Sequence, residues 1–280
     1  MPEGDTIFRA ARTLHRALAG KVVTRFESVL PHLARIDVDR PIAGRTVESV
    51  TARGKHQLMR FSGDLVLRTH MRMNGSWHVY RPGERWQRPR SAMRIVVATA
   101  DFVAVGFDVP DAELLTSRDL QRHAGLRSLG PDLLGAFDAA DAGRRIRERG
   151  ADAIGEVLLD QRVLAGVGNV FKSEILFLAR VHPSRRVRTL SDEEVRTVVD
   201  VSRKLLAANV AEPAGGAAVS WAAHRRTTGR LHPDEPLWVY GRSGEPCRRC
   251  GTPIAYAKQG LDARVTYWCP RCQPEPPPGA

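Results

Sequence analysis

Met1-Pro2-Glu3-Gly4-Asp5-Thr6 opens the chain, and a pattern typical of an amphipathic helix follows it directly. Apolar residues recur on one face of this predicted helix: Ile7, Ala11, Leu14 and Leu18. Asp5 is a good N-cap for the helix, and Gly20 ends the run. A helix that packs so soon after the start would hold Pro2 and Glu3 in one place, whereas a frayed, solvated terminus is the alternative.

The residue types at this terminus have a chemistry of their own. Removal of the initiator methionine, which is expected before a small residue, would leave Pro2 with a free secondary amine. An N-terminal amine has a pKa of roughly 7.7–8.0, so a neutral fraction exists near physiological pH. A neutral amine can attack a sugar or carbonyl carbon and form a Schiff base. Glu3 would lie beside it with a carboxyl group that can transfer protons.

Length and charge narrow the classes of partner. The 280 residues are enough for two domains with separate cores. A formal net charge of +12 predicts a polyanionic partner, with nucleic acid as the leading candidate. No apolar run approaches the length of a membrane span and no signal peptide precedes Pro2, so we expect a cytosolic protein without a membrane partner.

The sequence pattern changes from strand-like to helical near the middle of the chain. Short strands separated by turns fill the part up to about Leu115, as in 65–67, 77–80, 94–97 and 102–105. Ala100-Asp101 joins the last two as a tight hairpin, and the strand spacing predicts a sandwich or barrel. From Ala151 the pattern is helical, and Ser191-Asp192-Glu193-Glu194 is a capping box that opens a further helix.

The four cysteines form two Cys-x-x-Cys pairs, separated by residues 251–268: Cys247, Cys250, Cys269 and Cys272. Two such pairs make a tetrahedral four-sulfur site that suits structural Zn²⁺ and leaves no ligand position for water. Two redox-active dithiols are the alternative, but no βαβ pattern surrounds them. We therefore expect one structural zinc ion.

Three further features suit a phosphate group. Gly166-Val167-Gly168-Asn169 permits a tight turn with N–H groups exposed at a helix N-terminus, although a plain helix–helix turn fits equally well. Arg264 lies near the tip of a predicted hairpin between the cysteine pairs. Lys55 lies in a turn that enters a strand, where a lysine is often simply solvated. His70 and His78 are interpreted as ordinary strand residues.

Four features, in this order, closely resemble the formamidopyrimidine-DNA glycosylase and endonuclease VIII family: Met1-Pro2-Glu3-Gly4, Gly54-Lys55, Gly166-Val167-Gly168-Asn169, and Val239-Tyr240-Gly241-Arg242 before the cysteine pairs. The resemblance covers nearly the whole chain. It implies an α+β fold with an N-terminal helix, an antiparallel β-sandwich, a helix-two-turn-helix domain and a C-terminal four-cysteine zinc finger. It also implies a cleft between the sandwich domain and the rest.

Domain boundaries follow from combining the resemblance with the patterns above. We expect a catalytic β-sandwich domain at 1–116, a linker at 117–150 and a helix-two-turn-helix domain at 151–230. The zinc finger is expected at 237–273 and a proline-rich disordered tail at 274–280.

The resemblance implies a role for each candidate site residue. Pro2 would be the Schiff-base nucleophile, and Glu3 the acid that helps to open the sugar. Lys55 would contact phosphate and assist elimination, and Asn169 would bind the DNA backbone. Arg264 would grip the phosphates that flank the lesion and take part in δ-elimination.

Two weaker matches concern DNA binding alone. Arg162 lies where the family often has a basic phosphate contact. Met73 matches the wedge that fills the gap left by an extruded nucleotide, although an ordinary strand-end side chain is the alternative. Gly4-Asp5-Thr6, and the absence of an arginine-rich loop with a phenylalanine wedge at 108–113, favour the endonuclease VIII branch, which removes oxidised pyrimidines.

The sequence thus predicts a monomeric bacterial repair enzyme of the cytoplasm and nucleoid. It would act on damaged double-stranded DNA by base removal followed by β,δ-elimination. An oxidised-purine glycosylase of the same fold is one alternative. A noncatalytic zinc-finger protein that binds damaged DNA is the other, and the intact Pro2-Glu3 pair favours the enzyme.

Overall fold

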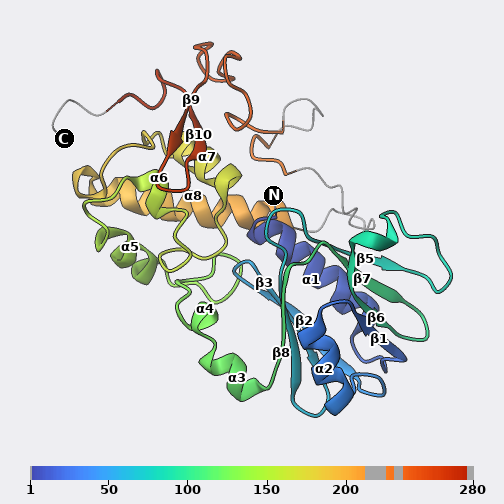
Figure 1. Ribbon diagram of the computed structural model, residues 1–280. Helices are drawn as coiled ribbons and strands as arrows, with labels where there is room; N and C mark the ends of the chain where they lie inside the picture. Colours follow the sequence, from blue (N-terminus) through green and yellow to red (C-terminus); the bar gives the residue numbers. More distant parts are fainter. Residues whose placement is uncertain (1, 212–224, 230–235, 276–280) are drawn as a thin grey trace. The chain divides into compact units, whose positions relative to one another are not determined.

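The computed structural model describes residues 2–211, 225–229 and 236–275 (Figure 1). These residues form two compact units, the first of residues 2–127 and the second of the described residues from Ser128 onward. Each unit has a hydrophobic core of its own. Among the described helices, none is long and apolar enough to cross a membrane. Met1 and residues 276–280 of the predicted tail lie outside the described residues.

Helix α1 (Gly4–Leu18) begins the first unit. Its predicted apolar face is confirmed, because the residues on it are all buried: Ile7, Ala11, Leu14 and Leu18. Gly20, just beyond the helix, adopts a φ of +79°, which residues with a Cβ rarely take. The prediction that Asp5 is the N-cap is wrong, because the extended residue before the helix is Glu3. Asp5 lies in the first turn, where its buried carboxylate accepts a hydrogen bond from Arg9 and is stabilised by the positive end of the helix.

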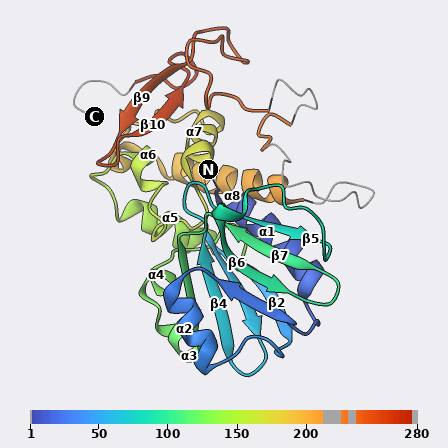
Figure 2. The ribbon, with the colours of Figure 1, turned by 45° about the vertical axis from the view of Figure 1, so that its right-hand side comes forward.

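Two antiparallel four-stranded sheets form the β-sandwich of the first unit, as the sequence predicts (Figures 1 and 2). One has the order β2-β3-β4-β8, with β2 (Val47–Arg53), β3 (His56–Phe61), β4 (Leu65–His70) and β8 (Asp111–Leu115). The other has the order β1-β6-β7-β5, with β1 (Arg25–Ser28), β6 (Met93–Ala98), β7 (Val103–Phe107) and β5 (Ser76–Tyr80). Both sheets and α1 contribute side chains to one core.

The predicted strands agree closely with the observed ones. Those at 65–67, 77–80 and 94–97 lie within β4, β5 and β6, and the one at 102–105 begins a residue later as β7. The β6–β7 hairpin closes where Thr99 N donates to Phe102 O at 2.8 Å. Helix α2 (Pro31–Asp39) and the 3₁₀ helix η1 (Arg90–Ala92) complete the sandwich.

Residues 117–150, where the sequence predicts a linker, contain short helices: α3 (Ser117–Arg122), α4 (Ala124–Arg127) and α5 (Ala139–Arg147). Side chains ahead of two of them satisfy their first N–H groups. Thr116 Oγ1 accepts from Asp119 N at 3.1 Å, and Asp138 Oδ1 accepts from Ala140 N at 2.8 Å. Helices this short show too few apolar repeats to be recognised from the sequence pattern.

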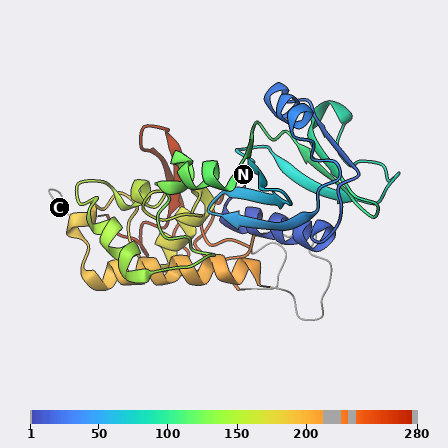
Figure 3. The same ribbon diagram turned by 90° about the horizontal axis from the view of Figure 1, so that it is seen from below.

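The second unit is helical: α6 (Ile154–Val157), α7 (Asn169–Leu178), η2 (Val187–Thr189) and α8 (Asp192–Val210) follow α5. Figure 3 shows α8 running along one side of this unit. The predicted capping box of α8 is confirmed, because Glu194 N donates to Ser191 Oγ at 3.2 Å and Ser191 N donates to Glu194 Oε2 at 2.7 Å. Helix α7 is buried on nearly all sides, so its first residues are held rigidly.

The predicted hairpin between the cysteine pairs consists of β9 (Ala255–Gln259) and β10 (Arg264–Trp268). It packs directly on α7. Lys172 Nζ, fully buried, donates to Thr266 Oγ1 at 2.6 Å, and Tyr267 N donates to Ser173 Oγ at 3.3 Å. The hairpin and α7 therefore form one rigid element.

Candidate functional site

The structure places Pro2 and Glu3 directly before α1. Pro2 is partly exposed, whereas Glu3 is fully buried and its carbonyl oxygen accepts the hydrogen bond of Ile7 N at 3.1 Å. The first residues are therefore docked, not frayed, as the apolar face of α1 predicts. The positive end of the helix dipole lies at this point and disfavours a second positive charge there. Pro2 therefore directly precedes a residue whose side chain is fully buried at the start of the helix.

Lys55 lies at the tip of the two-residue turn between β2 and β3, where Arg53 pairs with His56. Gly54 supplies the positive φ, +57°, that such a turn requires. Lys55 is half-buried. In the next strand pair His56 lies opposite His70, so the turn places Lys55 close to both imidazoles.

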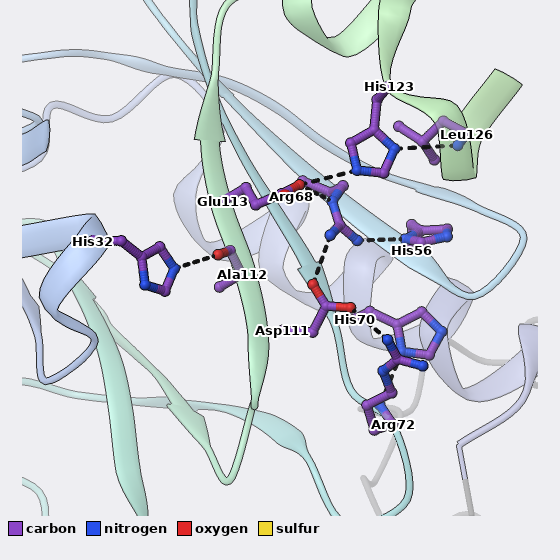
Figure 4. A network of polar contacts seen from close by, with 10 residues as sticks. All are labelled: His32, His56, Arg68, His70, Arg72, Asp111, Ala112, Glu113, His123 and Leu126. Atoms are coloured by element: carbon purple, nitrogen blue, oxygen red, sulfur yellow. Dashed lines mark hydrogen bonds and ion pairs between the residues drawn. The ribbon is translucent and has the colours of Figure 1, made fainter.

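A buried arginine behind this turn fixes the imidazole of His56 (Figure 4). Arg68, on β4, is 4% exposed and donates from Nε to Glu113 Oε2 at 2.7 Å and from Nη2 to Asp111 Oδ1 at 2.6 Å. Its Nη1 lies 2.9 Å from His56 Nδ1, and His123 Nε2 lies 3.0 Å from Glu113 Oε2. Since an arginine only donates, His56 Nδ1 accepts and Nε2 carries the proton.

Both neighbouring imidazoles are neutral at physiological pH. Burial, followed by the charges of His70 and Arg68, lowers the pKa of His56 to about 3. Burial, followed by the charge of Arg72, lowers the pKa of His70 to about 4. The backbone N–H of Arg72 donates to His70 Nδ1 at 3.1 Å, so Nε2 is the donor in this ring too. Beside Lys55 there are thus two neutral N–H donors with fixed tautomers, a combination suited to phosphate oxygen.

The sequence does not predict this network, since it presents His70 as an ordinary strand residue. Its members come from β3, β4 and β8, and only the strand register brings them together. One signal was present: Arg68 directly follows the apolar run Leu65-Val66-Leu67, which indicates a charged residue in a buried strand.

Met73 lies in the tight loop between β4 and β5 and is 53% exposed. The loop is closed by Gly75 N, which donates to Met71 O at 2.9 Å. A Cβ on Gly75 would lie 2.5 Å from that oxygen, so the loop has no room for a side chain at this position. Met73, Asn74 and Asp108 line a surface cavity of about 440 Å³. An exposed apolar side chain on a tight, hydrogen-bonded loop has the form that a wedge requires.

In the second unit, Asn169 and Arg264 lie close together. Asn169 is the first residue of α7, after an extended Gly168, and its Nδ2 donates to Val265 O at 2.8 Å. The Nδ2 group has a second hydrogen that can be donated to a ligand. Among the described residues, Oδ1 has no hydrogen-bond partner. Arg264 begins β10, is 41% exposed, and has the carboxylate of Asp262 at 3.8 Å. The turn and the hairpin tip therefore present adjacent donors.

Arg162 is placed differently. Its side chain is 65% exposed, but the guanidinium forms a two-point pair with Asp160, with Nε to Oδ1 at 2.9 Å and Nη2 to Oδ2 at 2.7 Å. A phosphate would have to compete with this carboxylate.

The four cysteines form one cluster whose sulfur atoms all lie within 4.8 Å of one another. Zn–S bonds of about 2.3 Å in a tetrahedron need sulfur atoms about 3.8 Å apart. The Sγ atoms of Cys250 and Cys269 are 3.5 Å apart, and those of Cys247 and Cys272 are 4.0 Å apart. The site therefore fits a closed, structural zinc ion, and its cysteines pack with Phe177, Val239 and Ile254 in a small core.

Comparison with known proteins agrees with these features. Family models match along the chain: the formamidopyrimidine-DNA glycosylase N-terminal domain at residues 1–124, its H2TH domain at 129–220, and a zinc finger found in FPG and IleRS at 244–274. A Streptomyces coelicolor protein named probable endonuclease 8 2 is 46% identical over 100% of this chain and 97% of its own length. This chain belongs to the formamidopyrimidine-DNA glycosylase and endonuclease VIII family.

Other members of the formamidopyrimidine-DNA glycosylase and endonuclease VIII family are similar over their full length. The DNA-(apurinic or apyrimidinic site) lyase Nei2 of Mycolicibacterium smegmatis is 40% identical, over 98% of this chain and 99% of that protein. The Lactococcus lactis Fpg, solved in complex with DNA that contains an abasic site, superposes with a TM-score of 0.80 at 24% identity. That superposition covers 98% of this chain and 100% of the other, and it confirms the fold.

Proposed function

We propose that this chain is a DNA glycosylase and abasic-site lyase of base-excision repair that removes oxidised bases, pyrimidines above all. The observation that carries the proposal is the docked start of α1, where a partly exposed Pro2 precedes a fully buried Glu3. The names of its relatives, endonuclease 8 and abasic-site lyase, support the same reaction.

The chemistry begins at the Pro2 nitrogen, once Met1 is removed. The neutral amine attacks the anomeric carbon of the damaged nucleotide, and a nitrogen–carbon bond forms. The glycosidic bond breaks, and its electron pair leaves with the base. The nitrogen loses the proton that it carries after the attack, and Glu3 gives a proton to the ring oxygen. The bond between C1′ and the ring oxygen then breaks, and the nitrogen lone pair forms the second bond of an iminium ion. Loss of the C2′ proton into this electron sink expels the 3′-phosphate, and a second elimination expels the 5′-phosphate.

The DNA backbone is held by donors in both units. In the first unit we assign phosphate binding to Lys55, supported by the neutral imidazoles of His56 and His70. In the second unit we assign it to Asn169 and Arg264, which the contact between α7 and β10 places together. Such contacts fix the register of the DNA without reading its sequence.

Two further residues have narrower roles in this proposal. Met73 fills the gap that the extruded nucleotide leaves in the stack. Arg162 joins the phosphate contacts after giving up Asp160, so its contribution is the smallest. The zinc ion, held by the four cysteines, stabilises the segment that carries Arg264 and supplies no step of the reaction.

Preference for pyrimidine lesions rests on two features of the sequence. Gly4-Asp5-Thr6 and the stretch 108–113 depart from the pattern of the purine-lesion branch. We expect a monomer in the bacterial cytoplasm, associated with the nucleoid through damaged double-stranded DNA.

Product analysis tests the proposal. Duplexes carry an oxidised pyrimidine, an oxidised purine or an abasic site at one position, and the strand ends are identified after incubation. Faster cleavage at the pyrimidine lesion, with phosphates left on both ends, is the expected result. Faster cleavage at the purine lesion would overturn the assigned preference, and binding without cleavage of any duplex would overturn the enzymatic function.

A further inference from the structure

A second basic site lies on the β-sandwich, on residues to which no role has been given so far. The loop 81–89 between β5 and η1 extends beyond the edge of the sandwich (Figure 1). It encloses much of a surface cavity of about 630 Å³. Arginines dominate the lining of this cavity: Arg25, Arg81, Arg85, Arg88 and Arg90. Among the described residues that line the cavity, Glu84 is the one carboxylate, so this lining is strongly cationic.

Two of these arginines are held in place by aromatic rings. The guanidinium of Arg81 lies 4.6 Å from the centroid of the Phe102 ring, and that of Arg90 lies 5.4 Å from the centroid of the Trp86 ring. Trp86 is itself fixed, because it packs edge-on against Phe107 at 5.7 Å. Stacking uses the face of a guanidinium and leaves its N–H groups on the edge for an oxyanion. Less side-chain entropy is lost when such an arginine binds.

Carboxylates neutralise only part of the charge. Arg88 pairs with Asp108 at 2.6 Å, and Arg25 lies 3.4 Å from Glu27. Within the described part of the chain, no carboxylate lies within 4 Å of the side-chain nitrogens of the remaining three: Arg81, Arg85 and Arg90. The Glu84 carboxylate accepts from the backbone N–H of Arg81 at 2.8 Å. These three exposed guanidiniums, two on the loop and one at the start of η1, line the same cavity and repel one another, so a bound anion would stabilise them.

The same loop is tied to the loop that carries Met73. Arg88 donates from Nη1 to Ser76 Oγ at 3.1 Å and to Asn74 O at 3.3 Å, and from Nη2 to Asp108 Oδ2. Asn74 and Asp108 line the cavity beside Met73. The arginine loop therefore continues the surface at which we place the wedge.

We propose that Arg81, Arg85 and Arg90 bind phosphodiester groups of the DNA backbone at a distance from the lesion. This inference rests on the proposed function only in taking DNA as the ligand. Two observations favour DNA over an acidic protein as the ligand. The whole chain carries a net charge of +12, and the loop 81–89 is hydrogen-bonded to the loop that carries Met73. The loop thus lengthens the stretch of duplex that the first unit contacts.

The salt dependence of binding tests the inference. Each phosphate contact contributes about 0.9 to the slope of log affinity against log salt, so three contacts contribute about 2.7. Raising the salt concentration from 50 to 200 mM weakens DNA binding by both proteins. The factor by which binding weakens should be about 40 times smaller for the triple variant Arg81→Gln, Arg85→Gln, Arg90→Gln than for the unchanged protein. A matched control removes three exposed arginines of α2 and α3, Arg35, Arg118 and Arg122, and so has the same net charge.

Duplexes of two lengths locate the contact. One has arms of about 15 base pairs on each side of the lesion, roughly 50 Å, and the other has arms of about 5. On the long duplex we expect a smaller salt slope for the triple variant than for the unchanged protein, and on the short duplex little difference between them. The melting temperature of the variant protein should not change. If the triple variant and the control variant had equal salt slopes on both duplexes, the inference would be wrong. It would also be wrong if the triple variant kept the salt slope of the unchanged protein but lost binding to an acidic peptide.

Failure of this inference and failure of the proposed function are separable. Equilibrium binding is measured on undamaged as well as damaged duplex and does not require cleavage. Strand cleavage on the short duplex reports the chemistry at Pro2, and the triple variant should retain it.

Discussion

Acid should destabilise the first unit through His56, and the size of the effect follows from the Arg68 network. The pKa of His56 is about 3 in the folded chain against an ordinary value of 6.5. Between these two values the unfolded chain binds the additional proton, so the free energy of unfolding decreases as the pH falls through this window. Integrating the linkage relation from pH 7 to pH 5 gives a loss of about 2 kcal/mol from this one residue.

His56→Gln isolates the contribution. The glutamine carbonyl oxygen can still accept from Arg68 Nη1, but it does not protonate. The groups that face His56 and remain are Arg68, His70, Asp111 and His123, so acid will still weaken the variant, though less. We expect the free energy of unfolding of the variant to fall by about 2 kcal/mol less than that of the unchanged protein between pH 7 and pH 5.

Differential scanning calorimetry at pH 7, 6 and 5 measures the effect. For a unit of residues 2–127, a change of 2 kcal/mol in the free energy of unfolding corresponds to a shift of about 6–10 °C in Tm. Hydrogen exchange of the β3 and β4 amides assigns the transition to the first unit. Equal acid sensitivity of the variant and the unchanged protein would refute the reasoning.

Further outcomes follow from individual residues. Glu3→Gln should lower base removal about 10²- to 10⁴-fold with little change in DNA affinity by fluorescence anisotropy, and a loss of binding would contradict the acid role. Asn169→Ala should weaken DNA binding by up to about tenfold and Asn169→Asp by more, because a carboxylate repels phosphate; the reverse order would exclude a phosphate contact. Removing zinc with a chelator, or Cys269→Ser, should abolish hydrogen-exchange protection of β9 and β10; retained protection would show that zinc is not structural. Met73→Ala should slow base removal from duplex about tenfold but spare abasic cleavage, and equal loss on both would argue against a wedge.

Much of the fold was readable from the sequence because its signals are local. The Ser191 capping box, the apolar face of α1 and the β6–β7 hairpin each depend on residues within a few positions of one another. The four cysteines are far apart in the chain, but their spacing within each pair is a local signal too.

What escaped prediction depends on long-range register or on short helices. Arg68 meets Asp111 and Glu113 only because β4 pairs with β8 in a particular register. The helices in 117–150 are stabilised by caps such as Thr116 and Asp138, and each is too short to show a period. The same holds for the site residues. Local motifs indicate Asn169 and Arg264 one by one, but the two are adjacent only because α7 packs on β10, which no local pattern indicates.

Covalent trapping tests the central claim most directly. The purified protein, with Pro2 verified as its first residue by N-terminal sequencing, is incubated with borohydride and duplex DNA that carries either an oxidised pyrimidine or an abasic site. Pro2→Gly serves as the control, since it replaces the secondary amine by a primary one. We predict a covalent protein–DNA complex on both substrates that is strongly reduced in the control. Intact DNA binding with no complex on either substrate would contradict an amine nucleophile at the start of α1.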